Sequence, residues 1–245
     1  MSRVYSPRTA VALMVTTMED GSTVEVVTVG NEGLVGFPVF LGTDSMPMEV
    51  FTQIDGEAVT LPAPVVKEAS SNGGALRPLL ARDTQALLSQ IAQAGACNRL
   101  HPIDQRCARW LLMSHDRVPG DDFSLTQEFL SQMLGVRRAT VTTAASILQR
   151  AGYIRYRRGR IQIADREGLE AASCECYRTI RSEYERLIGS KGEGGSCGFD
   201  SGTSRNSDAV PVFTVSSRGK IIRSGAKDPL PLFHVRGSFV APLQG

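Results

Sequence analysis

Basic and hydroxyl-bearing side chains concentrate between residues 124 and 163, and these residue types suit contact with a polyanion. An arginine can hold the O6 and N7 atoms of a guanine together, and a threonine can touch a thymine methyl group or a phosphate. The N-terminus of a helix also favours a nearby phosphate. The exposed face of one predicted helix carries these side chains, namely Arg137, Arg138, Ala139, Thr140 and Thr143.

A basic helix face can also be merely solvated, but a solvated face usually mixes both signs of charge. Residues 137–160 hold seven arginines and no acid. Residues 1–75 carry nine acids and only three basic residues, so the net charge of +2 hides a segregation. We therefore expect one part of the chain to meet nucleic acid and another part not to.

Two short helices around a glycine are expected to hold this face. Ser124, Thr126 and Gln127 offer helix-start chemistry, and Ser124 with Gln127 has the spacing of a capping box. Gly135 would end the first helix in the left-handed conformation. Three residues follow at the spacing of a helix-turn-helix. They are a small residue where the helices cross, a glycine in the turn and an apolar residue in the core, namely Ser131, Gly135 and Val141. The buried face of the second helix is predicted at Val141, Ala144, Ala145 and Leu148.

A β-hairpin is predicted directly after the second helix. Residues 153–157 and 160–163 alternate as strands around Arg158 and Gly159. Its arginines, Arg155, Arg157, Arg158 and Arg160, would lie along the sugar-phosphate backbone and supply salt-sensitive affinity. Tyr153 is expected to pack, whereas Tyr156 could pack or stack on a base. Thr126 and Gln127, at the start of the first helix, complete the expected DNA-contacting set.

The first 75 residues are expected to form a small antiparallel β-domain. Residues 11–17 and 23–29 predict a hairpin around the turn at Asp20 and Gly21. Residues 51–54 and 58–61 predict two further short strands. These strands are few for a closed barrel, so the domain is expected to be incomplete, with no strand before Val11.

A helical period begins at residue 76. Its apolar stripe comprises Leu76, Leu79, Leu80, Leu87, Leu88, Ile91 and Ala94. The stripe could bury itself against a second copy of the chain, which we favour, or could cover the open face of the β-domain. A second helix near residues 103–114 would bury Ile103, Cys107, Trp110 and Leu111.

Other features exclude several classes of protein. No run of about 18 apolar residues predicts a membrane span, no secretory signal is evident, and five scattered cysteines favour the cytoplasm. Cys174 and Cys176 would point apart on a helix, and the histidines are isolated, so no metal site is expected. No nucleophile motif supports an enzyme. Residues 190–245, rich in glycine and serine, predict a flexible tail in which residues 210–215 could form a strand.

At this point the sequence resembles a known family. The runs CNRLHPIDQRCARWLLMSHDRV and FSLTQEFLSQMLGVRRATVTTAASILQRAGYIRYRRGRIQI look like the winged helix-turn-helix of the cyclic-AMP receptor protein/Fnr (Crp/Fnr) superfamily of bacterial transcription regulators. The stretch TTMEDGSTVEVVTVGNEGLVGFPVFLG is similar to the middle of that family's cyclic-nucleotide-binding β-roll, and residues 76–97 correspond to its dimerisation helix. The chain would begin inside the β-roll, and its tail has no family counterpart.

Departures from the family pattern limit what the resemblance implies. Phe37 follows Gly36 where cyclic-nucleotide-binding members carry a glutamate, and Pro47 and Met48 stand near the place of their Arg-Ser pair. A cyclic nucleotide is therefore not expected as a cofactor, because its phosphate would have no charged partner. An iron–sulfur cluster is not expected either, because cluster-binding members carry N-terminal cysteines and the first cysteine here is Cys97. On the recognition helix, Ala139 and Thr143 replace two base-contacting residues of better-known members, while Arg138 keeps the place of the first base-reading arginine.

Together these observations predict an α+β chain in four parts. They are a partial cyclic-nucleotide-binding-like β-roll (1–75), a dimerisation helix and connector (76–115), a winged helix-turn-helix domain (116–189) and a flexible tail (190–245). The expected function is sequence-specific binding of a palindromic double-stranded DNA site by a cytoplasmic homodimer, through the recognition helix at 137–149 and the wing at 153–163. RNA polymerase is a candidate partner. The alternative is a small-ligand sensor with weak or lost DNA binding.

Overall fold

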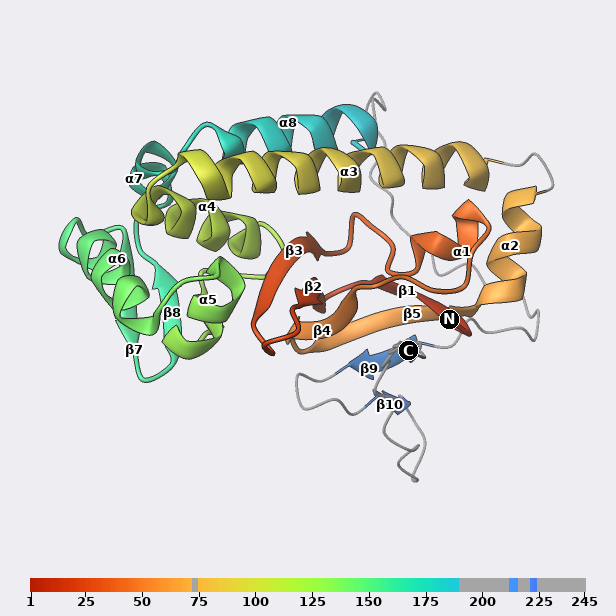
Figure 1. Ribbon diagram of the computed structural model, residues 1–245, viewed down its shortest axis with the longest axis horizontal. Coiled ribbons are helices and arrows are strands. Elements are labelled where there is room, and N and C mark those ends of the chain that lie inside the picture. Colours follow the sequence, from red (N-terminus) through yellow and green to blue (C-terminus); the bar gives the residue numbers. More distant parts are fainter. Residues whose placement is uncertain (72–74, 190–211, 216–220, 224–245) are drawn as a thin grey trace, which may run out of the picture.

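The fold places a β-rich N-terminal part beneath a long helix and a second, mainly helical part at one end of that helix (Figure 1). The computed structural model describes residues 1–71, 75–189, 212–215 and 221–223. This mixture of helices and antiparallel sheets is the predicted fold class. No helix within these ranges has the length and apolar character needed to cross a membrane.

The N-terminal strands form two antiparallel sheets. One sheet has the order β3-β2-β4, and the other has the order β1-β5-β9-β10. The predicted hairpin is confirmed, because β2 pairs with β3 around the turn at Gly21. The strand bounds are β1 (Arg3–Pro7), β2 (Val11–Thr17), β3 (Thr23–Val29), β4 (Glu49–Ile54) and β5 (Gly56–Pro62).

The prediction of no strand before Val11 was wrong. Residues 3–7 form β1, which pairs with β5 and buries Val4. Pro7 obscured the strand, because proline lacks the N–H that a central strand must donate. Proline is tolerated here because β1 lies at the edge of its sheet. Between β3 and β4 a short helix, α1 (Phe37–Leu41), replaces the expected plain turn, and Gly36 and Gly42 flank it with positive φ angles.

Part of the C-terminal segment joins the β-rich part. β9 (Val212–Val215) pairs antiparallel with β5, and β10 (Ile221–Arg223) pairs with β9 (Figure 1). The expectation of a strand within 210–215 is thus confirmed for residues 212–215. The expectation of a flexible tail otherwise falls on residues outside the described ranges.

The long helix α3 (Leu76–Leu100) follows α2 (Ala63–Ser71), and its different faces contact different elements. Leu80 and Leu87 are buried against the β-rich part, each in an apolar cluster with strand residues. Gln90 faces α8 (Cys176–Leu187), where it accepts a hydrogen bond of 2.9 Å from the Tyr184 hydroxyl. Leu88 remains 61% exposed. The residues of the predicted apolar stripe therefore do not share one environment. Leu80 and Leu87 cover the β-domain, as one of the two alternatives predicted, whereas Leu88 faces solvent.

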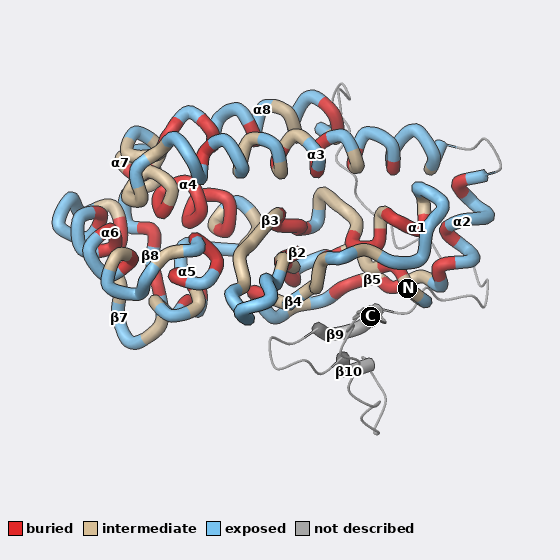
Figure 2. The backbone as a smooth tube through the Cα atoms, in the orientation of Figure 1, coloured by how far each residue is buried: buried red, intermediate tan, exposed pale blue. Residues whose placement is uncertain are grey.

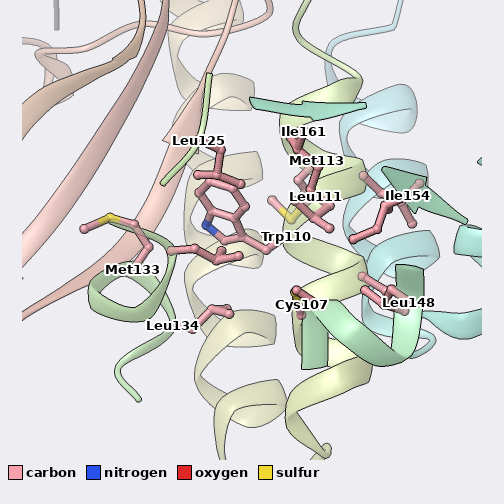
Figure 3. Packing of buried hydrophobic residues seen from close by; sticks show 14 of the residues in the cluster. Cys107, Trp110, Leu111, Met113, Leu125, Met133, Leu134, Leu148, Ile154 and Ile161 are labelled. Carbon is pink, nitrogen blue, oxygen red and sulfur yellow. The ribbon is translucent and has the colours of Figure 1, made fainter. Parts of the chain in front are cut away.

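The helical part is built on one apolar core (Figure 3). Trp110 and Leu111 of α4 lie among side chains of the neighbouring helices and wing strands. The predicted burial of Cys107, Trp110 and Leu111 is confirmed, and Ile103 is half-buried. The elements are α4 (Ile103–His115), β6 (Asp122–Ser124), α5 (Gln127–Leu134), α6 (Arg138–Arg150), β7 (Ile154–Arg157), β8 (Arg160–Ile163) and α7 (Arg166–Ala172).

Polar contacts join this helical part to the β-rich part. The Trp110 indole N–H donates to the Glu25 carboxylate on β3. The Gln53 amide on β4 donates to the Ser114 hydroxyl at 2.9 Å, and both groups are buried. Figure 2 shows that buried segments extend from the strands into α4 and α5. The two parts therefore share a continuous interior.

Asp83 points from α3 into the β-rich part, where it is buried. Within the described ranges its carboxylate oxygens have no regular hydrogen-bond partner. Burial raises the pKa of Asp83 to about 7, the charge of Glu32 raises it as well, and the backbone N–H of Leu34 lowers it. The folded protein thus keeps a proton on Asp83 that the unfolded chain releases near pH 4.

A carboxyl group whose pKa rises on folding favours the folded state at low pH and loses that contribution as the pH climbs through its folded pKa. We expect Asp83→Asn to remove this dependence. Between about pH 5 and pH 8 the thermal midpoint of the variant, measured by circular dichroism, should rise relative to that of the wild type. A difference in midpoint that stays constant over this range would contradict the raised pKa.

Candidate nucleic-acid interface

Helix α5 begins at a side-chain cap. The Phe129 backbone N–H donates to the Thr126 hydroxyl at 3.1 Å, so Thr126 is the N-cap. The predicted capping box of Ser124 with Gln127 was wrong, because Ser124 lies in β6, opposite Arg160 of β8. The neighbouring hydroxyl of Thr126 occupies the true helix boundary, and Thr126 is the residue that sequence spacing alone did not single out as the cap.

The turn between α5 and α6 depends on Gly135. Its φ is 64°, and its N–H donates to the Gln132 carbonyl at 3.0 Å. A left-handed residue of this kind reverses the chain within a few residues, which glycine permits at low steric cost. Helix α6 then buries its predicted face, Val141, Ala144, Ala145 and Leu148. The predicted helix-turn-helix is confirmed.

A hydrogen bond braces the two helices. The Thr142 hydroxyl donates to the Gln127 side-chain carbonyl at 2.8 Å. Gln127, expected to contact DNA, is engaged in this contact, while its amide nitrogen stays available as a donor. Thr142 was not among the predicted site residues, although its place one residue after Val141 puts it at the border of the buried face.

The start of α6 presents the predicted basic face. Arg138, Ala139 and Thr143 are exposed, and Thr140 is half-exposed. The described residues include no ion-pair partner for Arg137 or Arg138. Two guanidinium groups therefore stand without a countercharge at the N-terminus of the helix, where positive potential is already concentrated.

A shallow apolar hollow of about 320 Å³ lies between α6 and the start of α4. Ala139, Thr140, Thr143 and Ile147 line it from α6, and Ile103 and Asp104 line it from α4. The Thr143 hydroxyl donates back to the Ala139 carbonyl at 3.1 Å, which leaves its methyl group free for apolar contact. Sequence spacing does not indicate Asp104, because only the tertiary structure brings the start of α4 beside α6.

The wing forms as predicted. β7 and β8 pair around Arg158 and Gly159, which have φ angles of 49° and 75°. Two successive positive φ values are typical of a tight type I′ turn. The third strand of this sheet, β6, was not predicted from the sequence. The arginines at positions 155, 157, 158 and 160 are all exposed.

The wing arginines are not equivalent. Arg160 forms an ion pair with Asp122 of β6, so part of its charge is compensated. Arg155 and Arg158 have no ion-pair partner among the described residues. The Tyr156 hydroxyl donates to the Leu125 carbonyl at 2.6 Å. This contact settles the open alternative for Tyr156 in favour of packing.

A cluster of possible metal ligands lies apart from this surface. The Cys97 and Cys174 Sγ atoms are 3.5 Å apart, and the Cys176 Sγ is 3.4 Å from the His101 Nδ1. All four ligand atoms lie within 4.8 Å of one another. Cys174 and Cys176 were predicted to point apart on one helix, but α8 begins at Cys176, so they do not share a helix. The i, i+4 spacing of Cys97 and His101 was the missed signal.

Comparisons with known proteins agree with this geometry. Residues 105–172 match the family model for the Crp-like helix-turn-helix domain. No curated protein matches the sequence significantly.

Solved structures share the fold at low sequence identity. FixK2 from Bradyrhizobium japonicum superposes with a TM-score of 0.61 and 17% identity, covering 71% of this chain and 88% of that one. A CRP-family transcriptional regulator from Thermus thermophilus has a TM-score of 0.58 and 18% identity, covering 70% of this chain and 88% of that one. A putative Crp/Fnr-family regulator from Eubacterium rectale has a TM-score of 0.56 and 15% identity, with coverage of 70% and 80%.

Residues 105–172 therefore carry a Crp-like helix-turn-helix domain, and the described part of the chain shares its fold with solved regulators of the Crp/Fnr family.

Proposed function

We propose that this protein regulates transcription by binding a pseudo-palindromic DNA site as a homodimer. The observation that carries the proposal is the N-terminal face of α6, where Arg137 and Arg138 stand without ion-pair partners among the described residues. A basic helix face beside a basic wing fits the width of the major groove and the flanking phosphates.

Roles for the individual side chains follow from their positions. Arg138, in the first turn of α6, reads a base, with guanine as its best partner. Arg137, Thr140 and Thr143 touch bases or phosphates, and the methyl group of Thr143 suits a thymine. Ala139 lets the helix approach the groove closely. The remaining contacts go to the backbone, from Thr126, Gln127, Arg155, Arg157, Arg158 and Arg160.

The homodimer forms through the exposed face of α3. Along this face Gln85, Leu88, Ala92 and Gly95 follow one another at helical spacing, and each is exposed. The small residues Ala92 and Gly95, which follow Leu88 on this face, allow two helices to approach closely. Two copies paired here would present two recognition helices to successive major grooves.

The proposals for cofactors, for cellular location and for a further protein partner rest on fewer observations. Phe37 and Met48, near the places of the phosphate-binding residues of cyclic-nucleotide-binding relatives, pack against an apolar cluster. A cyclic phosphate there would lose its hydration without gaining a charged partner, so we propose no cyclic-nucleotide cofactor and no iron–sulfur cluster. A regulator of this kind acts in the cytoplasm, with RNA polymerase as a further partner.

Selection of bound sites from random duplex DNA at near-physiological salt tests the proposal. The expected product is a pseudo-palindrome with half-sites about 10 base pairs apart. Arg138→Ala should cost about 1–3 kcal/mol on the selected site and relax the preference at one position of each half-site. Salt-sensitive binding with no enriched sequence would contradict sequence-specific recognition.

Arg158→Ala is the matched control, since it removes the same kind of charge from the wing. It should weaken binding to all sequences alike and lower the slope of log affinity against log salt concentration by about 1. If Arg138→Ala behaved in this same uniform way, the base-reading role of Arg138 would be wrong.

A further inference from the structure

Four potential ligands converge where the end of α3 meets the start of α8. Cys97 lies in the last turn of α3, and His101 caps that helix one turn later. Cys174 lies in the connector after α7, and Cys176 is the first residue of α8. Segments about 75 residues apart in sequence thus bring three thiols and one imidazole together.

Two of the distances among the ligand atoms are close to those around one tetrahedral ion. Zinc binds thiolate sulfur at about 2.3 Å and imidazole nitrogen at about 2.0–2.1 Å, so ligand atoms around it lie about 3.5–3.8 Å apart. The Cys97–Cys174 and Cys176–His101 separations of 3.5 Å and 3.4 Å are close to this spacing, and all four atoms lie within 4.8 Å of one another, so small side-chain adjustments would bring them around one ion. An iron–sulfur cluster holds its cysteines farther apart, because they bind more than one iron atom.

The groups around the ligands also suit a metal ion. The His101 Nε2 lies 3.2 Å from the Glu175 carboxylate, which leaves Nδ1 facing Cys176 with its lone pair free. In zinc sites, a histidine ligand commonly donates the N–H of its other ring nitrogen to a carboxylate, which orients the ring. The Gln93 amide nitrogen lies 3.1 Å from the Cys176 Sγ, as a donor to a thiolate would. The three cysteines are buried from water, whereas His101 is partly accessible and provides a route for entry.

We propose that Cys97, His101, Cys174 and Cys176 bind one zinc ion per chain. The ion ties the end of the long helix α3 to α8, the second helix after the wing, and so fixes the winged helix-turn-helix relative to α3. With four protein ligands the site has no open position, which is typical of structural rather than catalytic zinc.

Metal analysis of the full-length protein, purified under reducing conditions, tests this inference without any DNA. We expect about one zinc per chain by mass spectrometry of the metal content. Replacement by Co²⁺ should produce the visible absorption of a tetrahedral site together with a thiolate charge-transfer band. Chelation of the wild-type metal should lower the thermal midpoint, because binding couples to folding.

Zinc retention in single variants tests which residues hold the ion. Cys174→Ser and His101→Ala should each lose the zinc or the Co²⁺ spectrum of the wild type, and the partly exposed His101 can be changed without opening the core. Cys107→Ala, which changes a buried cysteine of the helical core outside the cluster, should keep one zinc. Glu175→Gln should weaken zinc affinity about 10-fold or more.

Three results would overturn the proposal. The first is a folded wild-type protein with reduced thiols that retains no zinc after loading and dialysis. The second is iron and sulfide in place of zinc, with retention of the cluster dependent on these cysteines. The third is a Cys97–Cys174 disulfide that persists under reducing conditions. Each result leaves the DNA-binding proposal intact, because neither metal content nor Co²⁺ absorption depends on DNA.

Discussion

Leu88→Arg is expected to convert the protein from a dimer to a monomer and to abolish tight binding to a two-half-site operator. Leu88 lies midway along α3, and its side chain is 61% exposed on a face that neither the strands nor α8 cover. Two arginines brought together at a twofold axis would repel each other and would remove the central apolar contact.

The expected loss of DNA affinity is large because a dimer binds its second half-site intramolecularly. Losing that advantage typically costs a factor of about 10²–10⁴. Sedimentation equilibrium reports the oligomeric state, and titrations of a full operator and of a single half-site report the affinities. Affinity for the single half-site should change little, since α6 and the wing are untouched.

Leu79→Arg provides the control on the same helix. Leu79 belongs to the same apolar stripe in the sequence, but nine residues, or about two and a half turns, place it on the opposite side of α3 from Leu88. It is 42% exposed. A dimer that survived Leu88→Arg but dissociated in Leu79→Arg would show that a different face of α3 is the interface.

Trp110→Ala is expected to have the largest effect on stability. Trp110 is the single tryptophan of the sequence, its side chain is 2% exposed, and it packs in the core beneath the helix-turn-helix (Figure 3). Removal of a buried large aromatic side chain costs about 3–5 kcal/mol through lost burial and the cavity left behind. The free energy of unfolding, measured with urea and followed by circular dichroism, should fall by that amount.

Part of this cost comes from the partner of the indole. Glu25 is half-buried, and desolvation of its carboxyl group raises the pKa of that group, while hydrogen bonds from Thr28 and Trp110 lower it. Without the Trp110 donor, a buried charge or a protonation penalty remains. Trp110→Phe, which keeps most of the volume but not the donor, should cost about 1–3 kcal/mol. An equal loss for both variants would assign the effect to the hydrogen bond rather than to the cavity.

Local sequence was sufficient to predict the core of the winged helix-turn-helix. Gly135, the i, i+3, i+4, i+7 pattern from Val141 to Leu148, and the Arg158-Gly159 turn each act within a few residues of the chain. Helical spacing and turn stereochemistry are short-range properties, so a pattern in the sequence corresponds directly to a structure. The choice of Thr126 over Ser124 as the cap shows that even here an element boundary can move by two residues.

The environment of the α3 side chains and the cysteine–histidine cluster depend on long-range packing. The sequence stripe of α3 showed which residues are apolar, but only the positions of the strands and of α8 distinguish buried Leu87 from exposed Leu88. The meeting of Cys97 and His101 with Cys174 and Cys176 depends in the same way on α8 returning alongside α3. Periodicity describes one helix by itself, whereas its neighbours come from chain segments distant in sequence, whose arrangement is selected by the burial of the whole core.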